Sequence, residues 1–299
     1  MITDDEPCGS ITRGRGFASG KEDSMRLTVT GAAWIGLAVS SGYVPLLAQL
    51  QDNSEKQLTC QNGGYDSGSA RHCAIREQSA VSIGRLSVDA GRNGGATVKG
   101  WLRGDVLVRA RVEARGETEG AAAIMASQVS IDTSGGQVRA IGPESANNSG
   151  WSVSYEIFVP QNTDLTLKSN NGGITISDVR GQIRFDGNNG GVHLKRVAGD
   201  VTGATVNGGV QVELTGAIWD GRQLDVSTRN GGVTVVMPAQ YSAHIQAETG
   251  SGGMHSDFPV AQDSNARPRR LDFNLGSGGP LIHIATNNGG VSLKRAEAK

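Results

Sequence analysis

The sequence predicts an all-β fold: a parallel β-solenoid (β-helix) preceded by an N-terminal cap that contains one short helix. Every Gly-Gly pair follows an Asn or a Ser, and from Asn171 onward these triplets separate short apolar runs at near-regular intervals. Around the triplets, apolar residues alternate with polar ones, as in strands with one buried face. Aromatic residues make up 4% of the chain and Gly numbers 44, so the interior must be narrow and filled by Val, Ile, Leu and Ala.

The Asn-Gly-Gly and Ser-Gly-Gly triplets predict corners of the chain. Asn and Gly enter left-handed backbone conformations at the lowest cost, so each triplet can turn the chain where a branched residue would be strained. From Asn171 the intervals between triplets are 18, 18, 23, 21, 26 and 11 residues, and the last of these predicts a shortened final coil. The structural corners are Asn93, Asn171, Asn189, Asn207, Asn230 and Asn288, and further triplets begin at Asn62, Ser134, Ser251 and Ser277.

Two apolar positions on each side of a corner are predicted to face the interior. They are the third and fifth residues after the corner and the sixth and fourth before it. Because each fully buried aliphatic side chain contributes about 1.5–3 kcal/mol, the stack of coils rather than any single coil must stabilise the fold. The predicted inward residues are Leu165, Leu167, Ile174, Ile176, Ile183, Phe185, Val192, Leu194, Val210, Val212, Leu224, Val226, Val233, Val235, Leu271, Phe273, Ile282, Ile284, Val291 and Leu293.

Two geometries fit a repeat of strand, corner and strand. Asn-Gly is the strongest short hairpin signal, so an antiparallel meander in a sandwich or barrel is one of them. A solenoid with coils stacked in parallel is the other. We favour the solenoid because repeats with like side chains at like phases are expected when equivalent positions stack on one another. Stacked Asn side chains can also form hydrogen-bonded ladders.

The N-terminal region predicts a targeting segment. No charged residue occurs from Leu27 to Leu50, and Lys21 and Arg26 precede this stretch, as in a secretory signal. Ala48 offers a small residue for cleavage. The alternative is an uncleaved anchor, because a bilayer is spanned by about 20 apolar residues. Glycines within the stretch lower its hydrophobicity and favour cleavage.

The cysteine content supports export. Cys8 lies upstream of the signal, which leaves Cys60 and Cys73 as a pair in the mature chain. A disulfide between them would close a small polar loop and contribute about 3 kcal/mol. A metal or redox pair is the alternative, but His72 is the only neighbouring ligand type, which makes a poor zinc site.

The region before the regular coils has a different character. Residues 106–112 alternate as a strand, the Ala-rich segment 117–128 predicts a helix, and residues 151–159 predict a second long strand. This region is expected to cap the end of the stack. The expected organisation is a disordered leader plus signal peptide at 1–48, a disulfide-containing segment at 49–80, and a β-solenoid domain at 81–299 with its cap region at 81–160 and regular coils at 161–299.

Together, the Asn93-Gly94-Gly95 triplet, the 106–112 strand, the Ala-rich helix, Val159-Pro160 and the Asn-Gly-Gly coils resemble a known family. The chain is similar, over roughly residues 80–295, to the bacterial adhesin-like β-strand-repeat proteins of the domain of unknown function 4097 (DUF4097). The resemblance implies an exported, right-handed β-solenoid. It implies no catalytic residue, because the family has no established one. The sequence departs from the pattern where Ser replaces Asn at three corners.

An enzyme of the β-helix type would need carboxylates gathered on one face. The candidates Asp164, Asp178, Asp186, Asp200 and Asp225 occupy different phases relative to their corners, so they should not form the close pair that glycoside hydrolysis needs. A calcium site would require carboxylates beside the glycines, and the corners carry none. The sequence therefore indicates no catalytic, cofactor-binding or metal site.

Three tryptophans and several outward side chains remain to be assigned. The tryptophans are expected to cover coil ends rather than to stack on sugars. Outward residues of the coils, including two histidines, are expected to carry any binding specificity. These residues are Trp101, Trp151 and Trp219, and Thr175, Arg184, His193, Gln211, Thr234 and His283.

The function expected from these features is a non-catalytic, exported adhesin-like scaffold for cell-envelope or surface interaction. The formal net charge of −1 gives no reason to expect nucleic acid as a partner. The partner would be an envelope or surface protein or glycan, with no cofactor, in the periplasm, at the cell surface or outside the cell. Membrane contact is expected only if residues 27–50 stay uncleaved. The alternatives are a membrane-anchored envelope-stress sensor arm and a carbohydrate-active enzyme on a β-helix.

Overall fold

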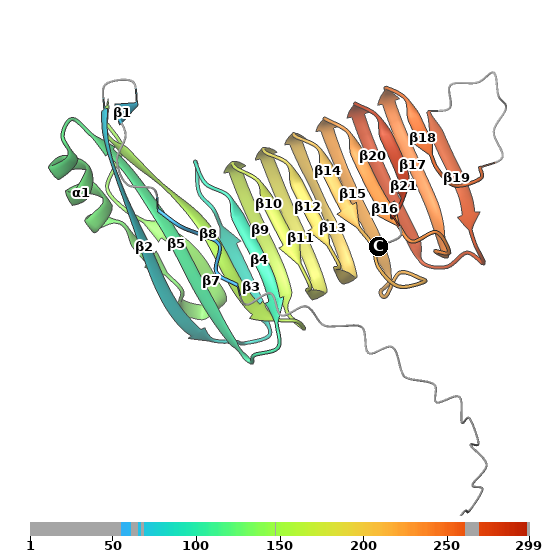
Figure 1. Cartoon of the computed structure of the whole chain (residues 1–299), viewed down its shortest axis with the longest axis horizontal. Coiled ribbons are helices and arrows are strands. Elements are labelled where there is room, and N and C mark those ends of the chain that lie inside the picture. Colours follow the sequence, from blue (N-terminus) through green and yellow to red (C-terminus); the bar gives the residue numbers. More distant parts are fainter. Residues whose placement is uncertain (1–54, 61–64, 67–68, 147, 261–268, 298–299) are drawn as a thin grey trace, which may run out of the picture. The chain divides into compact units, whose positions relative to one another are not determined.

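The computed structural model describes residues 55–60, 65–66, 69–146, 148–260 and 269–297. All of them belong to one compact unit, Leu50–Lys299 (Figure 1). The expected leader and signal segment, Cys8 and the Asn62 triplet lie outside the described residues.

The described strands form two mixed sheets, as expected for an all-β chain. In spatial order, the eleven-stranded sheet contains β1 (Tyr65–Asp66), β2 (Ser69–Val81), β5 (Asp105–Gly116), β8 (Gly150–Pro160), β4 (Ala96–Trp101), β10 (Ile174–Ser177), β12 (Val192–Lys195), β14 (Val210–Glu213), β16 (Val233–Met237), β21 (Val291–Arg295) and β18 (Met254–Ser256). The ten-stranded sheet contains β19 (Arg270–Leu275), β17 (Ala243–Ser251), β20 (Leu281–Asn288), β15 (Gln223–Asn230), β13 (Ala198–Asn207), β11 (Arg180–Asn189), β9 (Asp164–Asn171), β3 (Arg85–Asp89), β7 (Gln137–Ile141) and β6 (Ser130–Asp132).

The two sheets share a repeat unit, which we define as one strand of the ten-stranded sheet, a corner, and one strand of the eleven-stranded sheet. Neighbouring units pair in parallel and in register: Asn189 lies opposite both Asn171 and Asn207, and Ile174 lies opposite Val192. Because each corner joins strands of different sheets, it cannot be the turn of an antiparallel hairpin. The units in spatial order are β3/β4, β9/β10, β11/β12, β13/β14, β15/β16, β20/β21 and β17/β18.

The last repeat unit in the sequence is not the last in space. Strand β20 pairs with β15 on one side and with β17 on the other, while β21 pairs with β16 and β18, as Figure 1 shows. The C-terminal unit is thus inserted between two units that precede it in the chain. The prediction of a shortened final coil is wrong, because the inserted unit has both of its strands at full length.

The short final interval has a simple cause: Ser277 is not a corner of the stack. It follows β19, which runs antiparallel to β17 at the edge of the ten-stranded sheet. The Ser134 triplet is likewise a short 3₁₀ turn between β6 and β7. Of the Ser triplets, Ser251 does occupy a corner, opposite Asn288.

A continuous aliphatic core fills the space between the sheets. All the residues predicted to face the interior are buried except Phe273, which is partly buried and packs against the core. Phe273 differs because it belongs to β19, the antiparallel edge strand. The alternation in the sequence therefore identified the buried face correctly.

The first glycine of each corner is required by close packing, and at Gly231 and Gly252 a positive φ adds to this requirement. Among the described residues, the non-glycine residues with positive φ are Asn148, Asp178 and Arg196, none of which is a corner. A Cβ on Gly190 would lie 2.2 Å from the carbonyl oxygen of Gly172. The first glycines thus form a column, the glycine column, in which successive backbones touch.

The N-terminal part of the unit extends the eleven-stranded sheet with antiparallel strands. β5 pairs with β2 and β8, which confirms the two long strands expected in the cap region. The helix α1 (Glu119–Gln128) starts two residues later than predicted, because the Thr118 hydroxyl accepts a hydrogen bond from the Ala121 amide and caps it. Within the expected cap region, β3 and β4 already form the first repeat unit.

Across the described residues, no helix combines the length and apolar character needed to cross a bilayer.

Candidate functional site

The corner asparagines form one continuous row, the asparagine ladder. Each side-chain amide donates to the side-chain oxygen of the asparagine in the preceding unit, over 2.7–2.9 Å. In spatial order the row is Asn93, Asn171, Asn189, Asn207, Asn230 and Asn288, and the Ser251 hydroxyl continues it by donating to Asn288. The ladder fixes the register of the exposed corners, and every side chain that projects beside them is held in the same register.

A row of buried hydroxyls supports the corners from the inside. The Thr205 hydroxyl donates to the Gly190 carbonyl over 3.0 Å, and Thr228 donates to Gly208 over 2.7 Å. Ser169, Thr249 and Thr286 make the equivalent bonds. These bonds satisfy corner carbonyls that would otherwise be unpaired near the core.

The ten-stranded sheet carries a groove of about 540 Å³ that crosses β13, β15, β20, β17 and β19. The groove is open because Ala204, Ser227 and Ala285, which lie side by side on adjacent strands, have small side chains. The next two residues in the same cross-strand row are Glu248 and Arg270. We call this depression, lined by residues 204–206, 227–229, 248–250, 269–270 and 285–287, the sheet groove.

Charged and polar side chains surround the small residues of the sheet groove. Arg270 Nη1 lies 3.2 Å from Glu248 Oε1, so this arginine is partly neutralised. Arg229 is exposed, and within the described part of the chain no hydrogen bond or ion pair engages its side chain. Arg269, which is exposed, also lines the groove. The Ser227 hydroxyl lies on the same strand as Arg229, and the Asn287 amide lies on the adjacent strand β20. The groove can therefore offer exposed guanidinium groups, hydroxyl and amide groups, and one carboxylate.

Two histidine–aspartate pairs lie on the strands that form the groove. His283 Nδ1 is 2.7 Å from Asp225 Oδ1, and His244 Nε2 is 2.7 Å from Asp272 Oδ1. The hydrogen bond from His244 is the main cause that holds the pKa of Asp272 below its ordinary value. His283 was expected to be a plain outward residue, whereas it is half-buried and paired with an aspartate of the neighbouring unit.

The outward residues predicted on the eleven-stranded sheet also come together. Thr175, His193 and Gln211 lie opposite one another on β10, β12 and β14, and they line a second groove of about 420 Å³. Gln57 forms part of its wall. Thr234 follows Gln211 in the same row.

Of the aspartates considered as catalytic candidates, Asp164 and Asp200 share one register row of the ten-stranded sheet, on β9 and β13 with Gln182 of β11 between them, so the expectation of different phases is wrong for this pair. The other three do not join them. Asp178 lies at a turn with φ 58° and is bound by Arg196 at 2.6 Å through both carboxylate oxygens. Asp200 lies within β13, where it accepts a hydrogen bond from Arg222. Asp164, Asp186 and Asp225 occupy three different register positions of the ten-stranded sheet. Across the described residues, no cluster of three or more His, Cys, Asp or Glu side chains could hold a metal ion.

The tryptophans are packed rather than displayed. Trp101 is buried and stacks on Phe158, with ring centroids 5.2 Å apart. Trp219 is buried and donates to the Gly199 carbonyl, and the half-buried Trp151 donates to the Pro143 carbonyl. Their packing fits a structural role and leaves none of the three as an exposed platform for a sugar.

A buried ion network that the sequence did not reveal lies on the eleven-stranded sheet. The Glu156 carboxylate accepts hydrogen bonds from the Gln57 and Leu58 amides, from Lys99 at 2.9 Å and from Arg109 at 2.6 Å. Burial alone would raise the pKa of Glu156, but these four donors outweigh it and hold the pKa below its ordinary value. The alternation of β8 indicated a strand, but no local signal marks Glu156 as buried.

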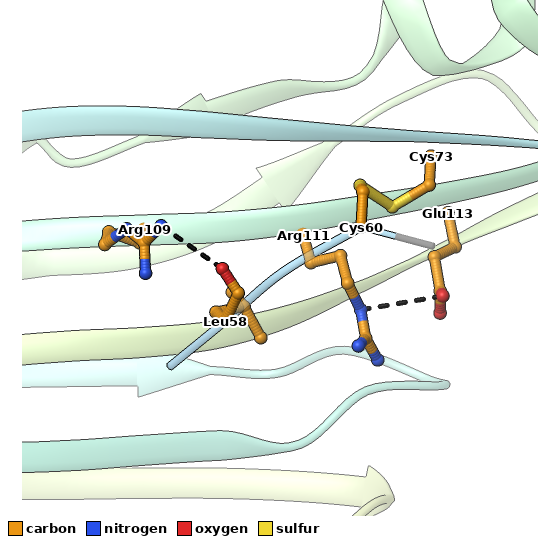
Figure 2. The surroundings of a disulfide bond; sticks show 6 residues. All are labelled: Leu58, Cys60, Cys73, Arg109, Arg111 and Glu113. Carbon is orange, nitrogen blue, oxygen red and sulfur yellow. Dashed lines mark hydrogen bonds and ion pairs between the residues drawn. A yellow bond between two sulfur atoms is a disulfide. The ribbon is translucent and has the colours of Figure 1, made fainter. Parts of the chain in front are cut away.

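The Glu156 network and the disulfide together fix residues 55–60, which we call the strap. Cys60 and Cys73 are joined by a disulfide. Figure 2 shows this bond beside Leu58, whose carbonyl oxygen accepts from Arg109 over 3.2 Å. The strap is therefore tied to β2 covalently and to β8 through Glu156.

Sequence reasoning missed the residues that make the sheet groove. The signal that could have found them is positional: Arg229 is the residue before a corner asparagine, and Ser227 and Ala285 are the third residues before theirs. Their contact, however, depends on the inserted C-terminal unit, which brings 285–287 next to 227–229.

Comparison with known proteins gives matches among solved structures. A "putative cell adhesion protein" from Clostridium sporogenes is 12% identical, covers 75% of this chain and 100% of its own, with a TM-score of 0.40. A "putative adhesin" from Bacteroides fragilis is 10% identical and covers 75% of this chain and 97% of its own, with a TM-score of 0.36. A "putative lipid binding protein" from Parabacteroides distasonis is 7% identical and covers 75% of this chain and 97% of its own, with a TM-score of 0.29. No match was found among the curated proteins.

The family model described as Toastrack DUF4097 matches residues 97–294, which is more than half of the chain. The matched range begins in the first repeat unit and ends in the inserted C-terminal unit. The match agrees with the resemblance carried by the Asn-Gly-Gly corners. The chain belongs to the Toastrack DUF4097 family.

Proposed function

We propose that this protein is a non-catalytic, exported adhesin-like scaffold that binds its partner through the outward faces of its stacked repeat units. The observation that carries the proposal is the register of those units. Equivalent residues of successive units lie opposite one another, and the asparagine ladder holds the corners together. Outward side chains therefore form straight rows at the strand spacing of about 4.8 Å, a surface suited to an extended ligand.

The same proposal includes the finer description of the fold and its compartment. The parallel pairing of the repeat units supports a right-handed parallel β-solenoid, since crossovers between parallel strands are right-handed in nearly all proteins. We assign 81–160 to a cap region and 161–299 to regular coils. The Cys60–Cys73 disulfide fits an oxidising compartment and supports export, with 1–48 as leader and signal peptide.

A binding role is favoured over catalysis by the state of the carboxylates. Asp178, Asp200 and Asp225 are each engaged by a cationic or histidine side chain, and they lie at different register positions. A glycoside hydrolase needs two carboxylates about 5–10 Å apart on either side of the scissile bond. The arrangement of these pairs supports a structural role for them.

The proposal is tested by binding of the purified full chain to envelope extracts and to arrays of surface glycans. We expect selective retention of a subset of ligands that survives washing at physiological salt. Uniform weak retention of every ligand would contradict an adhesin-like role. Turnover of a polysaccharide that disappears on substitution of two neighbouring carboxylates would instead support an enzyme.

The strap favours a second candidate, a membrane-anchored envelope-stress sensor arm. Residues 55–60 begin five positions after Leu50, where the uncharged stretch ends, and the buried Glu156 network fixes them to the sheet. If that stretch remains in the membrane, force or displacement there would reach the domain through the strap. Mass spectrometry of the mature N-terminus decides between the two: a chain beginning near Gln49 excludes the anchor.

A further inference from the structure

The sheet groove has the chemistry of a specific binding site, and membership of the family does not by itself predict such a site there. Its volume of about 540 Å³ falls in the range of ligand-binding clefts, about 300–1,000 Å³. The groove is made of segments distant in the sequence, and it is completed only when Ala285 and Asn287 of the inserted unit lie beside Ser227 and Arg229.

The position of the cations defines the first property of the ligand. Arg229 is exposed and unengaged within the described part of the chain, and a guanidinium presents two parallel N–H donors that match a carboxylate. Arg270, at the start of β19, lies three strands away in the same groove, a lateral separation of about 14 Å at the usual strand spacing, and the exposed Arg269 that precedes it lines the same end. Because Glu248 partly neutralises Arg270, the groove suits spaced anionic groups better than a dense run of negative charge.

The other polar groups of the groove define the second property. The Ser227 hydroxyl, the Asn287 amide and the Glu248 carboxylate can exchange hydrogen bonds with the hydroxyl groups of a ligand. Among the described residues, the lining contains no aromatic side chain on which a nucleic-acid base could stack. A ligand rich in hydroxyls and bearing spaced carboxylates is an acidic polysaccharide.

We propose that the sheet groove binds an acidic polysaccharide, with the Arg229 guanidinium holding a carboxylate and Ser227, Glu248 and Asn287 bonding to sugar hydroxyls. This inference rests on the proposed adhesin-like function and names the ligand class of one of its faces. The polymer lies along the row of Ala204, Ser227 and Ala285, whose small side chains leave it room.

The test is calorimetric titration of the full chain with a probe series: oligogalacturonate, neutral dextran oligomers and a single-stranded DNA oligonucleotide. We expect oligogalacturonate to bind and dextran not to bind. Arg229→Gln should weaken binding about 10-fold, the usual value of one charge-assisted bidentate contact, and Arg229→Lys should weaken it less. Ala285→Phe should abolish binding by filling the groove without changing its charge. Arg92→Gln is the matched control, because Arg92 is an exposed arginine outside the groove.

Three results would overturn the inference. The first is an Arg229→Gln variant that binds oligogalacturonate with the wild-type affinity, and the second is an equal loss of that affinity in Arg229→Gln and Arg92→Gln. The third is binding of the DNA oligonucleotide that is as tight as binding of oligogalacturonate and depends on Arg229 to the same extent. Circular dichroism and thermal midpoints check that each variant is folded. If the wild type and both groove variants bind envelope extracts equally, the scaffold function stands and the groove assignment fails. If the wild type retains nothing from any extract, the scaffold function itself fails.

Discussion

Gly190→Ala is a direct test of the glycine column. The new Cβ would lie 2.2 Å from the Gly172 carbonyl oxygen, 2.5 Å from the Gly172 carbonyl carbon and 3.0 Å from the Gly173 nitrogen. All three are backbone atoms of a neighbouring unit, so no flexible side chain can move to relieve the contact. The two units must separate, which strains the 2.9 Å hydrogen bond from the Gly172 amide to the Asn189 carbonyl.

The expected cost follows from these contacts. Overpacking of this kind destabilises by about 1–3 kcal/mol. A weakened backbone hydrogen bond adds about 1 kcal/mol. Alanine reduces the freedom of the unfolded chain and offsets about 0.4–1 kcal/mol of this. The net prediction for Gly190→Ala is a loss of about 1–3 kcal/mol in the free energy of unfolding.

The second glycine of the same corner provides the matched control. A Cβ on Gly191 would meet only the Gly209 carbonyl oxygen at 3.5 Å and His193 Nε2 at 3.7 Å, which are ordinary van der Waals contacts. Neither Gly190 nor Gly191 has a positive φ, so backbone strain does not separate them. Gly191→Ala should therefore be neutral or stabilise by about 0.4–1 kcal/mol.

The assay is urea denaturation of both variants, followed by circular dichroism, together with thermal melting. For a unit of this size, each kcal/mol shifts the melting temperature by about 2–4 °C. We expect Gly190→Ala to melt lower than Gly191→Ala by several degrees. Equal stability of the two variants, or greater stability of Gly190→Ala, would refute the claim that the first glycines are in backbone contact.

Three further predictions concern other parts of the fold. Asn189→Ala removes two hydrogen bonds of the asparagine ladder and should lower the free energy of unfolding by about 1 kcal/mol. Asn93→Ala removes the single bond at the end of the ladder and should lower it by about half as much. Equal urea midpoints of the two variants would contradict this. Glu156→Gln removes the counter-charge of the buried Lys99 and one of the two counter-charges of the half-buried Arg109, which keeps Glu77 at 3.0 Å. It should cost about 3–5 kcal/mol, against about 0–1 for the exposed Glu77→Gln. Because the pKa of folded Glu156 is depressed, its contribution is fully present above the ordinary Glu range, about pH 4.3, and is lost as the pH falls from there through the folded-state pKa. The stability difference between the variant and the wild type should therefore shrink as the pH falls below this range, and a difference that stays constant down to the pH of acid unfolding would show that Glu156 does not titrate in this way. A chain that ends at Pro280 lacks the inserted unit and leaves the edges of its neighbouring strands unpaired. Unpaired edges promote association between molecules, so size-exclusion chromatography with light scattering should show oligomers. A stable monomer would contradict the insertion.

Much of the repeat could be predicted because its signals are local. The alternation around Ile174 and Ile176 depends only on the period of a strand, and both residues are buried as expected. The Ala-rich segment formed its helix because the intrinsic propensity of Ala and the cap at Thr118 act within one turn. The pairing of Cys60 with Cys73 followed from their being the two cysteines downstream of the predicted signal.

The rest depends on contacts between segments that no local pattern relates. The repeat units present the same glycines, similar apolar positions and, except at Ser251, the same asparagine, so by local criteria each can pair equally well with any other. Only the tertiary structure decides that Asn288 stacks between Asn230 and Ser251. Three other features have the same origin, because each depends on distant segments of the chain that lie side by side. They are the need for the first glycine of each corner, the burial of Glu156 beneath the strap, and the assembly of the groove from five strands. The sequence by itself thus determined the faces and corners of the units. Only the tertiary structure decided their order in space, because that order depends on pairing between strands distant in the sequence.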